Sequence, residues 1–276
     1  MLRKRVLYVY IILIIGVFLF SEDKSYIDWI NGKIYSTISV KVKNDYNFPH
    51  AKLEKINIAR DMAKINYYRI LKEINLYEST PVIDYIEQSS ISNSRLFYLI
   101  DNATLNNIEY PDLNTVKLSY YINMFGDNSL MSILMNERDF YTEKLRSYEG
   151  YNFKVGFTGI VIDARGVLQS YDGYDVKVEP CLFVTVKDNE ERLVFNQYNV
   201  EAEVIKNKGM ARYSYDVNED QSDIVGISPL RIAAYGVGDR NGSIIVVTEN
   251  DAKKMLADDK TRSAIRSGKI VIIIDR

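Results

Sequence analysis

Asp163 and Arg165 come closest, in type and spacing, to a pair of residues that could do acid–base chemistry. They stand in the turn Asp163-Ala164-Arg165-Gly166, directly after the largely apolar segment 157–162. A carboxylate at the end of a strand can reach a cleft and act there as an acid or a base. An Asp and an Arg in a tight turn more commonly satisfy the backbone of that turn, and no second titratable cluster is spaced to work with them. We interpret the pair as structural.

Three other patterns resemble ligand sites only superficially. Gly236 and Gly238 form a GxG pair without a third glycine or a following helix, which argues against a dinucleotide site. The acidic residues between 216 and 223 lack the spacing of a calcium-binding EF-hand loop, so an exposed acidic loop is expected there. The chain has one histidine, His50, and one cysteine, Cys181, which excludes multi-histidine metal sites and a disulfide within the chain. We therefore predict no catalytic, cofactor-binding or metal-binding residues, and no enzyme.

The composition places these residues in an ordinary globular chain. Its 276 residues are 47% hydrophobic and 26% charged, with a formal net charge of −2. Positive and negative residues alternate without a basic stripe, so nucleic acid is not an expected partner. The 22 tyrosines accompany many Ile, Asn and Lys residues, a bias that A/T-rich codons produce. We attribute them to that bias and not to an aromatic binding surface.

Residues 1–21 have the pattern of a secretory signal peptide or an N-terminal anchor. Arg3, Lys4 and Arg5 are followed by the uninterrupted apolar segment 6–20. This segment is long for a signal peptide and short for a membrane-spanning helix, so cleavage and retention both stay open. In either case we expect export to the periplasm, with contact to the membrane only through an uncleaved N-terminus anchored by residues 6–20.

The exported part divides into two predicted subdomains. Residues 22–135 contain a turn and strand after Trp29, a long amphipathic helix over 51–74 and an alternating strand over 115–123. Ala59 and Ala63 are small enough to let the buried face of the helix approach a sheet closely. The charged segment 136–150 is predicted to be a linker.

The second predicted subdomain spans residues 151–276. Strands are expected at 157–163, 182–186, 200–205, 230–235, 243–248 and 270–274, with a helix capped by Thr248. We expect 243–248 to be an edge strand. The predicted fold class is α+β, with two mixed subdomains in which helices pack on largely antiparallel sheets.

Four segments, taken in order, resemble the exported FlgP/FlgT-like family of flagellar accessory proteins and small outer-membrane lipoproteins. The segments are Asp28-Trp29-Ile30-Asn31-Gly32-Lys33-Ile34, Ala59-Arg60-Asp61-Met62-Ala63, the strand 110–116 with its sequel Phe125-Gly126, and the run 156–166. The resemblance covers roughly residues 26–276, and its most specific element is 158–166. Unlike the lipoprotein members, this sequence has no lipid-anchoring cysteine. The motif residues, to which we assign structural roles, are Trp29, Gly32, Ala59, Ala63, Gly159, Asp163, Arg165 and Gly166.

The resemblance implies a non-catalytic periplasmic structural or assembly protein, part of an accessory ring or collar on the flagellar motor. The implied partners are other envelope or flagellar motor proteins, or further copies of the chain in a ring. Two alternatives stay open: a generic envelope binding module unrelated to motility, and a hydrolase of envelope polymers that uses Asp163.

Overall fold

The computed structural model describes residues 25–41, 48–112, 115–135, 142–148, 151 and 155–276. The predicted signal or anchor segment 1–21 lies outside this range, as does most of the predicted linker 136–150. Within the described residues, no helix combines the length and the hydropathy required to cross a membrane. Helices and strands are both abundant, which confirms the α+β class.

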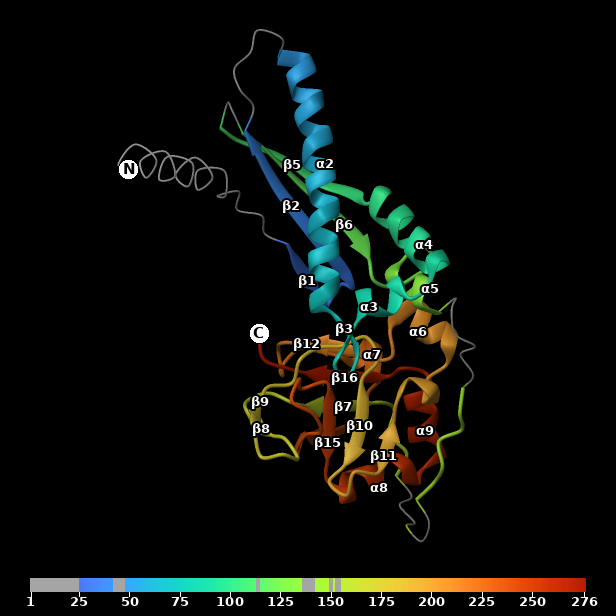
Figure 1. Cartoon of the computed structure of the whole chain (residues 1–276). Helices are drawn as coiled ribbons and strands as arrows, with labels where there is room; N and C mark the ends of the chain where they lie inside the picture. Colours follow the sequence, from blue (N-terminus) through green and yellow to red (C-terminus); the bar gives the residue numbers. More distant parts are fainter. Residues whose placement is uncertain (1–24, 42–47, 113–114, 136–141, 149–150, 152–154) are drawn as a thin grey trace, which may run out of the picture.

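The first half of the chain is an antiparallel sheet covered on one face by a long helix (Figure 1). The sheet has the order β1-β2-β6-β5, formed by β1 (Tyr26–Asp28), β2 (Lys33–Lys41), β6 (Thr115–Asn123) and β5 (Thr104–Asp112). The helix α2 (Phe48–Glu73) includes the predicted 51–74 helix except for its last residue, Ile74. Its buried Ala59 and Ala63 let it approach β2, where the Ser36 hydroxyl donates to the Ala63 carbonyl oxygen at 3.4 Å.

Shorter elements follow α2 and turn the chain toward the second half. They are β3 (Asn75–Tyr77), β4 (Thr80–Pro81), α3 (Val82–Glu87), α4 (Ser90–Asp101) and, after β6, α5 (Leu130–Met135). The alternation that predicts the strand 115–123 is confirmed as β6, whose residues are alternately half-buried and buried.

Two four-stranded sheets form the second half. One has the order β12-β16-β7-β13, from β12 (Arg212–Ser214), β16 (Ile270–Ile273), β7 (Ile160–Asp163) and β13 (Leu230–Ala233). The other has the order β11-β10-β15-β14, from β11 (Leu193–Phe195), β10 (Thr185–Asp188), β15 (Ile244–Val247) and β14 (Gly236–Val237). A small hairpin joins β8 (Leu168–Gln169) to β9 (Asp175–Val176).

The first of these sheets is parallel throughout, although antiparallel pairs are the more common kind among the described strands. The strand β16 is apolar along its whole length, and β7 is apolar from Ile160 to Ile162, because both strands are covered on both faces. Ile160 and Ile272 belong to the main core, whereas Val161 and Val271 face a smaller cluster with Val225 of α7 (Ser222–Val225). The remaining helices are η1 (Gln197–Asn199), α6 (Ala202–Lys208), α8 (Glu249–Ala257) and α9 (Asp259–Arg266).

Two expectations for the second half are wrong. The predicted strand 200–205 is the two-residue connection after η1 and the start of α6, because the Asn196 side chain caps η1 and Gly209, at φ +80°, ends α6. The predicted edge strand 243–248 is β15, an interior strand between β10 and β14 with all four residues buried. The apolar pattern of the sequence identified β15 as a strand but did not identify the strands beside it. The parallel neighbour β10 is distant in the sequence, and a local pattern carries no information about it.

The β3–β4 hairpin of the first half is inserted into the second (Figure 1). The backbone N–H groups of Leu182 and Phe183 donate to the carbonyl oxygens of Asn75 and Leu76 at 3.1 and 2.7 Å. Leu76 is fully buried, and one hydrophobic cluster runs from Trp29 to Ile274. The two halves therefore share a single core.

Candidate binding cleft

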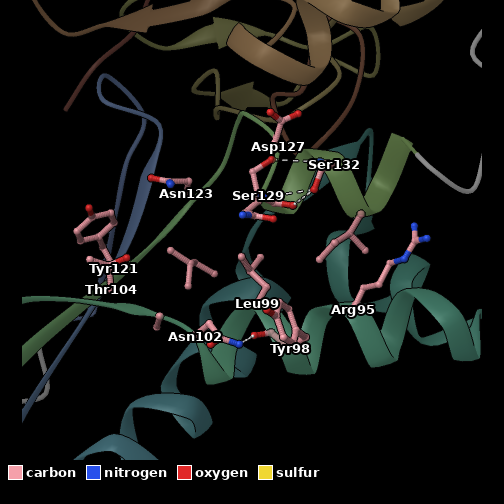
Figure 2. A pocket seen from close by; sticks show the side chains of 14 residues that line it. Arg95, Tyr98, Leu99, Asn102, Thr104, Tyr121, Asn123, Asp127, Ser129 and Ser132 are labelled. Carbon is pink, nitrogen blue, oxygen red and sulfur yellow. Dashed lines mark hydrogen bonds between the residues drawn. The ribbon is translucent and has the colours of Figure 1, made fainter.

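A cleft of about 500 Å³ lies between α4, the start of β5, the end of β6 and the segment that leads into α5 (Figure 2). The volume suits a small molecule or a short segment of a polymer. Its walls combine apolar side chains with amides, hydroxyls and one guanidinium. The lining residues that carry the argument are Arg95, Tyr98, Asn102, Asp127, Ser129 and Ser132.

The sequence of α4 determines which side chains face the cleft. The Ser89 hydroxyl caps the helix by accepting from the Ser92 backbone N–H at 3.3 Å. Leu96 and Ile100 are buried on the inner face. Arg95 and Tyr98 are exposed and line the cleft, and Figure 2 shows them on the same helix. The helical period of 3.6 residues thus separates core positions from cleft positions.

The opposite wall is a turn stabilised by two serines. The Ser129 hydroxyl donates to the Gly126 carbonyl oxygen at 2.6 Å and accepts from the Ser132 backbone N–H at 3.1 Å. The Ser132 hydroxyl donates to the Ser129 carbonyl oxygen at 2.7 Å. Because these hydroxyls bond the turn's own backbone, they hold the wall in shape and are poorly placed to act as nucleophiles.

The second half of the chain fixes this wall in position. The Gly126 backbone N–H donates to the Lys206 carbonyl oxygen at 2.8 Å, and the Lys206 ammonium lies 2.7 Å from the Asp127 carboxylate. The hydrogen bond from Lys206 lowers the pKa of Asp127 below its ordinary value. Asp127 is therefore an ionised, paired group at the rim.

Arg95 is the cleft's uncompensated charge. It is exposed, and no ion pair to it occurs among the residues that the structure describes. An arginine is charged at all physiological pH values and offers a fork of donors that matches carboxylate or phosphate groups. The cleft is therefore suited to a partner that places an anionic or strongly accepting group against α4.

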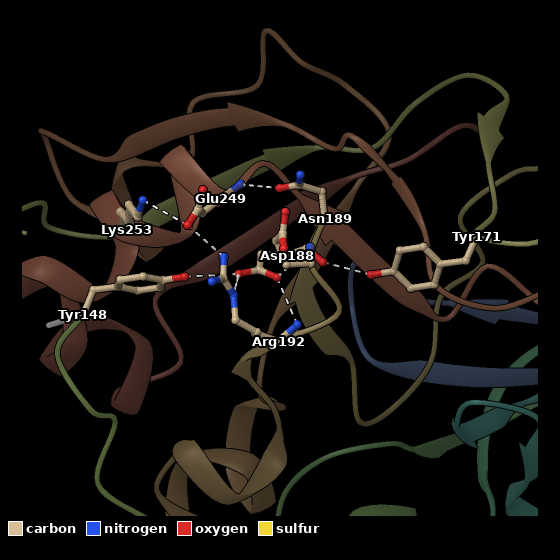
Figure 3. Close-up of polar contacts among 8 residues, drawn as sticks. Tyr148, Tyr171, Asp188, Asn189, Arg192, Glu249 and Lys253 are labelled. Carbon is tan, nitrogen blue, oxygen red and sulfur yellow. Dashed lines mark hydrogen bonds and ion pairs between the residues drawn. The ribbon is translucent and has the colours of Figure 1, made fainter.

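A second polar cluster, around Asp188, is held together by contacts within the protein (Figure 3). The Asp188 side chain is almost fully buried and accepts from the backbone N–H groups of Glu190 and Arg192, each at 2.9 Å. The Arg192 guanidinium lies 2.7 Å from Asp188 and 3.0 Å from Glu249. Tyr148 donates to the same carboxylate at 3.4 Å. These bonds tie the β10–β11 turn to α8 and to the segment before β7, so we interpret the cluster as structural.

The sequence motif residues fall outside the cleft. Trp29 is buried and meets the Tyr213 ring edge-on at a centroid distance of 5.4 Å. Gly32, at φ +61°, faces the Phe125 ring, which a Cβ would meet at 2.7 Å. Gly159 lies against Val225, and a Cβ there would meet the Val225 backbone at 2.5 Å. These residues serve close packing between segments.

The structure places Asp163 and Arg165 in a two-bond ion pair. The Arg165 Nε and one terminal nitrogen donate to the two Asp163 carboxylate oxygens at 2.8 and 2.7 Å. The hydrogen bond from Arg165 lowers the pKa of Asp163 below its ordinary value. Gly166, at φ +85°, donates its N–H to Asp275 at 3.0 Å. Cys181 is buried, and burial raises the pKa of its thiol to about 12.

Sequence reasoning did not identify the cleft. Its lining residues come from two stretches of the chain, 95–104 and 121–133, and neither contains a motif that predicts a site. The unusual combination of an exposed Arg95 and Tyr98 on a helix with a buried opposite face is the one local signal that could have suggested it.

Comparison with known proteins gives one partial similarity. Residues 159–276 match a family model described as Treponema pallidum Tp0624, second domain. The matched segment runs from just before β7 to the end of β16 and covers less than half of the chain. A search of curated proteins finds no match. The comparison thus relates residues 159–276 to a known domain, and the match does not extend to the residues that line the cleft.

Proposed function

We propose that the protein is a non-catalytic structural or assembly protein of the periplasm, and that it binds a partner in the cleft between α4 and β6. The observation that carries this proposal is Arg95, an uncompensated guanidinium on a cleft whose serine hydroxyls are committed to their own turn. Such a site offers recognition by charge, amides and an aromatic ring. It lacks a converging acid and base among the described lining residues.

Export is supported by the sequence alone. The basic residues 3–5 and the apolar segment 6–20 have the order and composition of a signal peptide or anchor. The segment lies outside the described residues, so this part of the proposal depends on the pattern of residue types.

Within this class, the more specific proposal is a component of a flagellar accessory ring or collar. It rests on the four segments that resemble the FlgP/FlgT-like family, among them 158–166. The alternative is an envelope binding module with no role in motility, since one fold can carry unrelated sites.

Replacing Arg95 with alanine tests the cleft. We expect cross-linking of intact cells to recover a specific envelope partner with the wild-type protein. With Arg95→Ala, affinity for that partner should fall about tenfold, because a charge-assisted contact is removed. Arg60→Ala is the matched control, since Arg60 is an exposed arginine on α2, away from the cleft.

The cleft proposal would be contradicted if Arg95→Ala and Arg60→Ala lost the same affinity for the partner, or if neither variant lost affinity. The same variants, expressed in a deletion strain, separate the two narrower functions. Missing motor-associated density and defective swimming, restored by the wild type and not by Arg95→Ala, would support the motor role. Normal motors in the deletion strain would reject the motor role and favour the envelope binding module.

The hydrolase alternative places chemistry at Asp163. Arg165 holds both carboxylate oxygens and keeps Asp163 ionised, which leaves the group poorly suited to donate a proton. We expect neither the wild-type protein nor the double variant Asp163→Asn, Arg165→Ala to degrade purified envelope polymers. Loss of a measurable turnover from a folded double variant would favour the hydrolase.

A further inference from the structure

The face of the first sheet opposite α2 carries an ordered set of polar and aromatic side chains. Along β2, Ile34, Ser36 and Ile38 point toward α2, so Lys33, Tyr35, Thr37 and Ser39 lie on the other face. The strand register then places defined partners beside them on β1, β6 and β5. We call this surface the open face.

A row of tyrosines crosses three strands of the open face. Tyr26 pairs with Tyr35, which pairs with Tyr121. The Tyr26 and Tyr35 rings are stacked at a centroid distance of 4.9 Å, and those of Tyr35 and Tyr121 lie 5.8 Å apart. Tyr26 is 52% exposed although it stacks on one side. Adjacent strands lie about 4.8 Å apart, so the row is about 10 Å wide, and Tyr26 is the exposed ring at its end.

The next row along the strands consists of small hydrogen-bonding groups. Thr37 pairs with Ser119, whose hydroxyl lies 3.2 Å from the Thr37 hydroxyl, and Ser119 pairs with Asn107 of β5. With Tyr26 at one end, these residues line a shallow trough of about 220 Å³. Asn107 is exposed. The trough thus places hydroxyl and amide groups beside an accessible aromatic ring.

The tyrosine row and the hydrogen-bonding row are uncharged, and a row with charged residues lies on each side of them. Within each of these two flanking rows the charges cancel. On one side, Asp28 pairs with Lys33, whose ammonium lies 4.3 Å from the centre of the Tyr121 ring. On the other side, the Lys117 ammonium lies 3.2 Å from the Glu109 carboxylate. Each flanking row therefore holds one cation and one anion. The open face has no charge excess that would favour an anionic or a cationic partner.

We propose that the open face binds a neutral polysaccharide chain. The apolar C–H face of a sugar ring packs on an aromatic ring, and its hydroxyls need the donors and acceptors that Asn107 and Ser119 supply, while the buried Thr37 holds the Ser119 hydroxyl at 3.2 Å. A shallow, open trough suits an extended chain better than a compact ligand. Tyr121 also lines the α4–β6 cleft, so a long chain on the open face would run toward it. This inference goes beyond the proposed function, because it holds whatever occupies the cleft.

The proposal assigns Tyr26, Tyr35 and Tyr121 a role that codon bias alone does not give them. Codon bias explains their number but not the register that aligns Tyr26, Tyr35 and Tyr121 in one row on the face opposite α2. Cross-strand stacking stabilises such a row. It does not require the exposed Tyr26 to be followed by a row of uncharged hydrogen-bonding groups.

Titration of the purified protein with the hexamer of N-acetylglucosamine, followed by calorimetry, tests the proposal. We expect saturable binding that weakens roughly five- to tenfold in Tyr26→Ala, because a stacked ring is lost. Asn107→Ala should weaken binding by about fivefold through the loss of a hydrogen bond. Tyr235→Ala is the matched control: Tyr235 is 65% exposed and lies in the second half of the chain, so its removal should leave binding unchanged.

Circular dichroism establishes whether each variant is folded. If Tyr26→Ala does not fold, Asn107→Ala still tests the proposal, because Asn107 is exposed. The proposal is overturned if the hexamer does not bind, if Tyr235→Ala weakens binding as much as Tyr26→Ala, or if polygalacturonate binds more tightly than the neutral hexamer. Retention of hexamer binding by Arg95→Ala would show that the open face acts independently of the cleft.

Discussion

Replacement of Asp188 with alanine is expected to lower the free energy of unfolding by about 3 kcal/mol. The variant leaves two backbone N–H groups of the β10–β11 turn without their acceptor and removes one of the two carboxylates that the Arg192 guanidinium contacts. Glu191 in this turn has φ +62°, a conformation that the surrounding bonds must maintain. Urea denaturation followed by circular dichroism measures the change.

Asp172→Ala provides the matched control for this variant. Asp172 also pairs with an arginine, Arg240, but the side chain is 64% exposed and the contact is 3.4 Å long. Its loss should cost at most about 0.5 kcal/mol, because water screens an exposed pair. If the two variants proved equally stable, the structural role assigned to the Asp188 cluster would be wrong.

The second large effect is expected from Leu76→Ala, which creates a cavity where the β3–β4 hairpin enters the second half. Leu76 is fully buried between the halves, so its truncation should cost about 3 kcal/mol. Trp29 is the one tryptophan of the sequence and lies against Tyr213 of the second half, so its fluorescence reports on this junction. We expect the fluorescence transition to shift to lower urea together with the circular dichroism transition.

Leu193→Ala is the control, because Leu193 is 50% exposed and lies away from the hairpin. It should shift neither transition by more than about 0.5 kcal/mol. An unchanged fluorescence midpoint in Leu76→Ala would mean that the hairpin does not couple the two halves.

Elements with a strong local period could be predicted from the sequence. The alternation from Val116 to Ile122 predicted β6, and the spacing of Ala59, Ala63 and Tyr67 predicted the buried face of α2. Both patterns come from one face of one element meeting the core, which a window of the sequence contains.

Features that depend on distant pairing could not be predicted in this way. The position of β15 inside its sheet depends on β10, about 60 residues earlier, and the tyrosine row depends on the register of three strands. The cleft has the same origin, since Arg95 and Ser129 face each other only because β5 and β6 pair. The residue types in each segment do not indicate which distant segment lies beside it.

The placement of β16 has a consequence for when the second half can fold. β16 pairs with β7 on one side and β12 on the other, so the parallel sheet lacks an interior strand until residues 270–273 are available. Contacts between such distant segments form slowly, because the chain must close a long loop first. During that interval the apolar segment 160–162 can pair with β13 on one edge only, and its other edge is an unpaired apolar strand edge that favours aggregation. Delayed closure of this kind also keeps a polypeptide unfolded for passage through a membrane channel before folding on the far side.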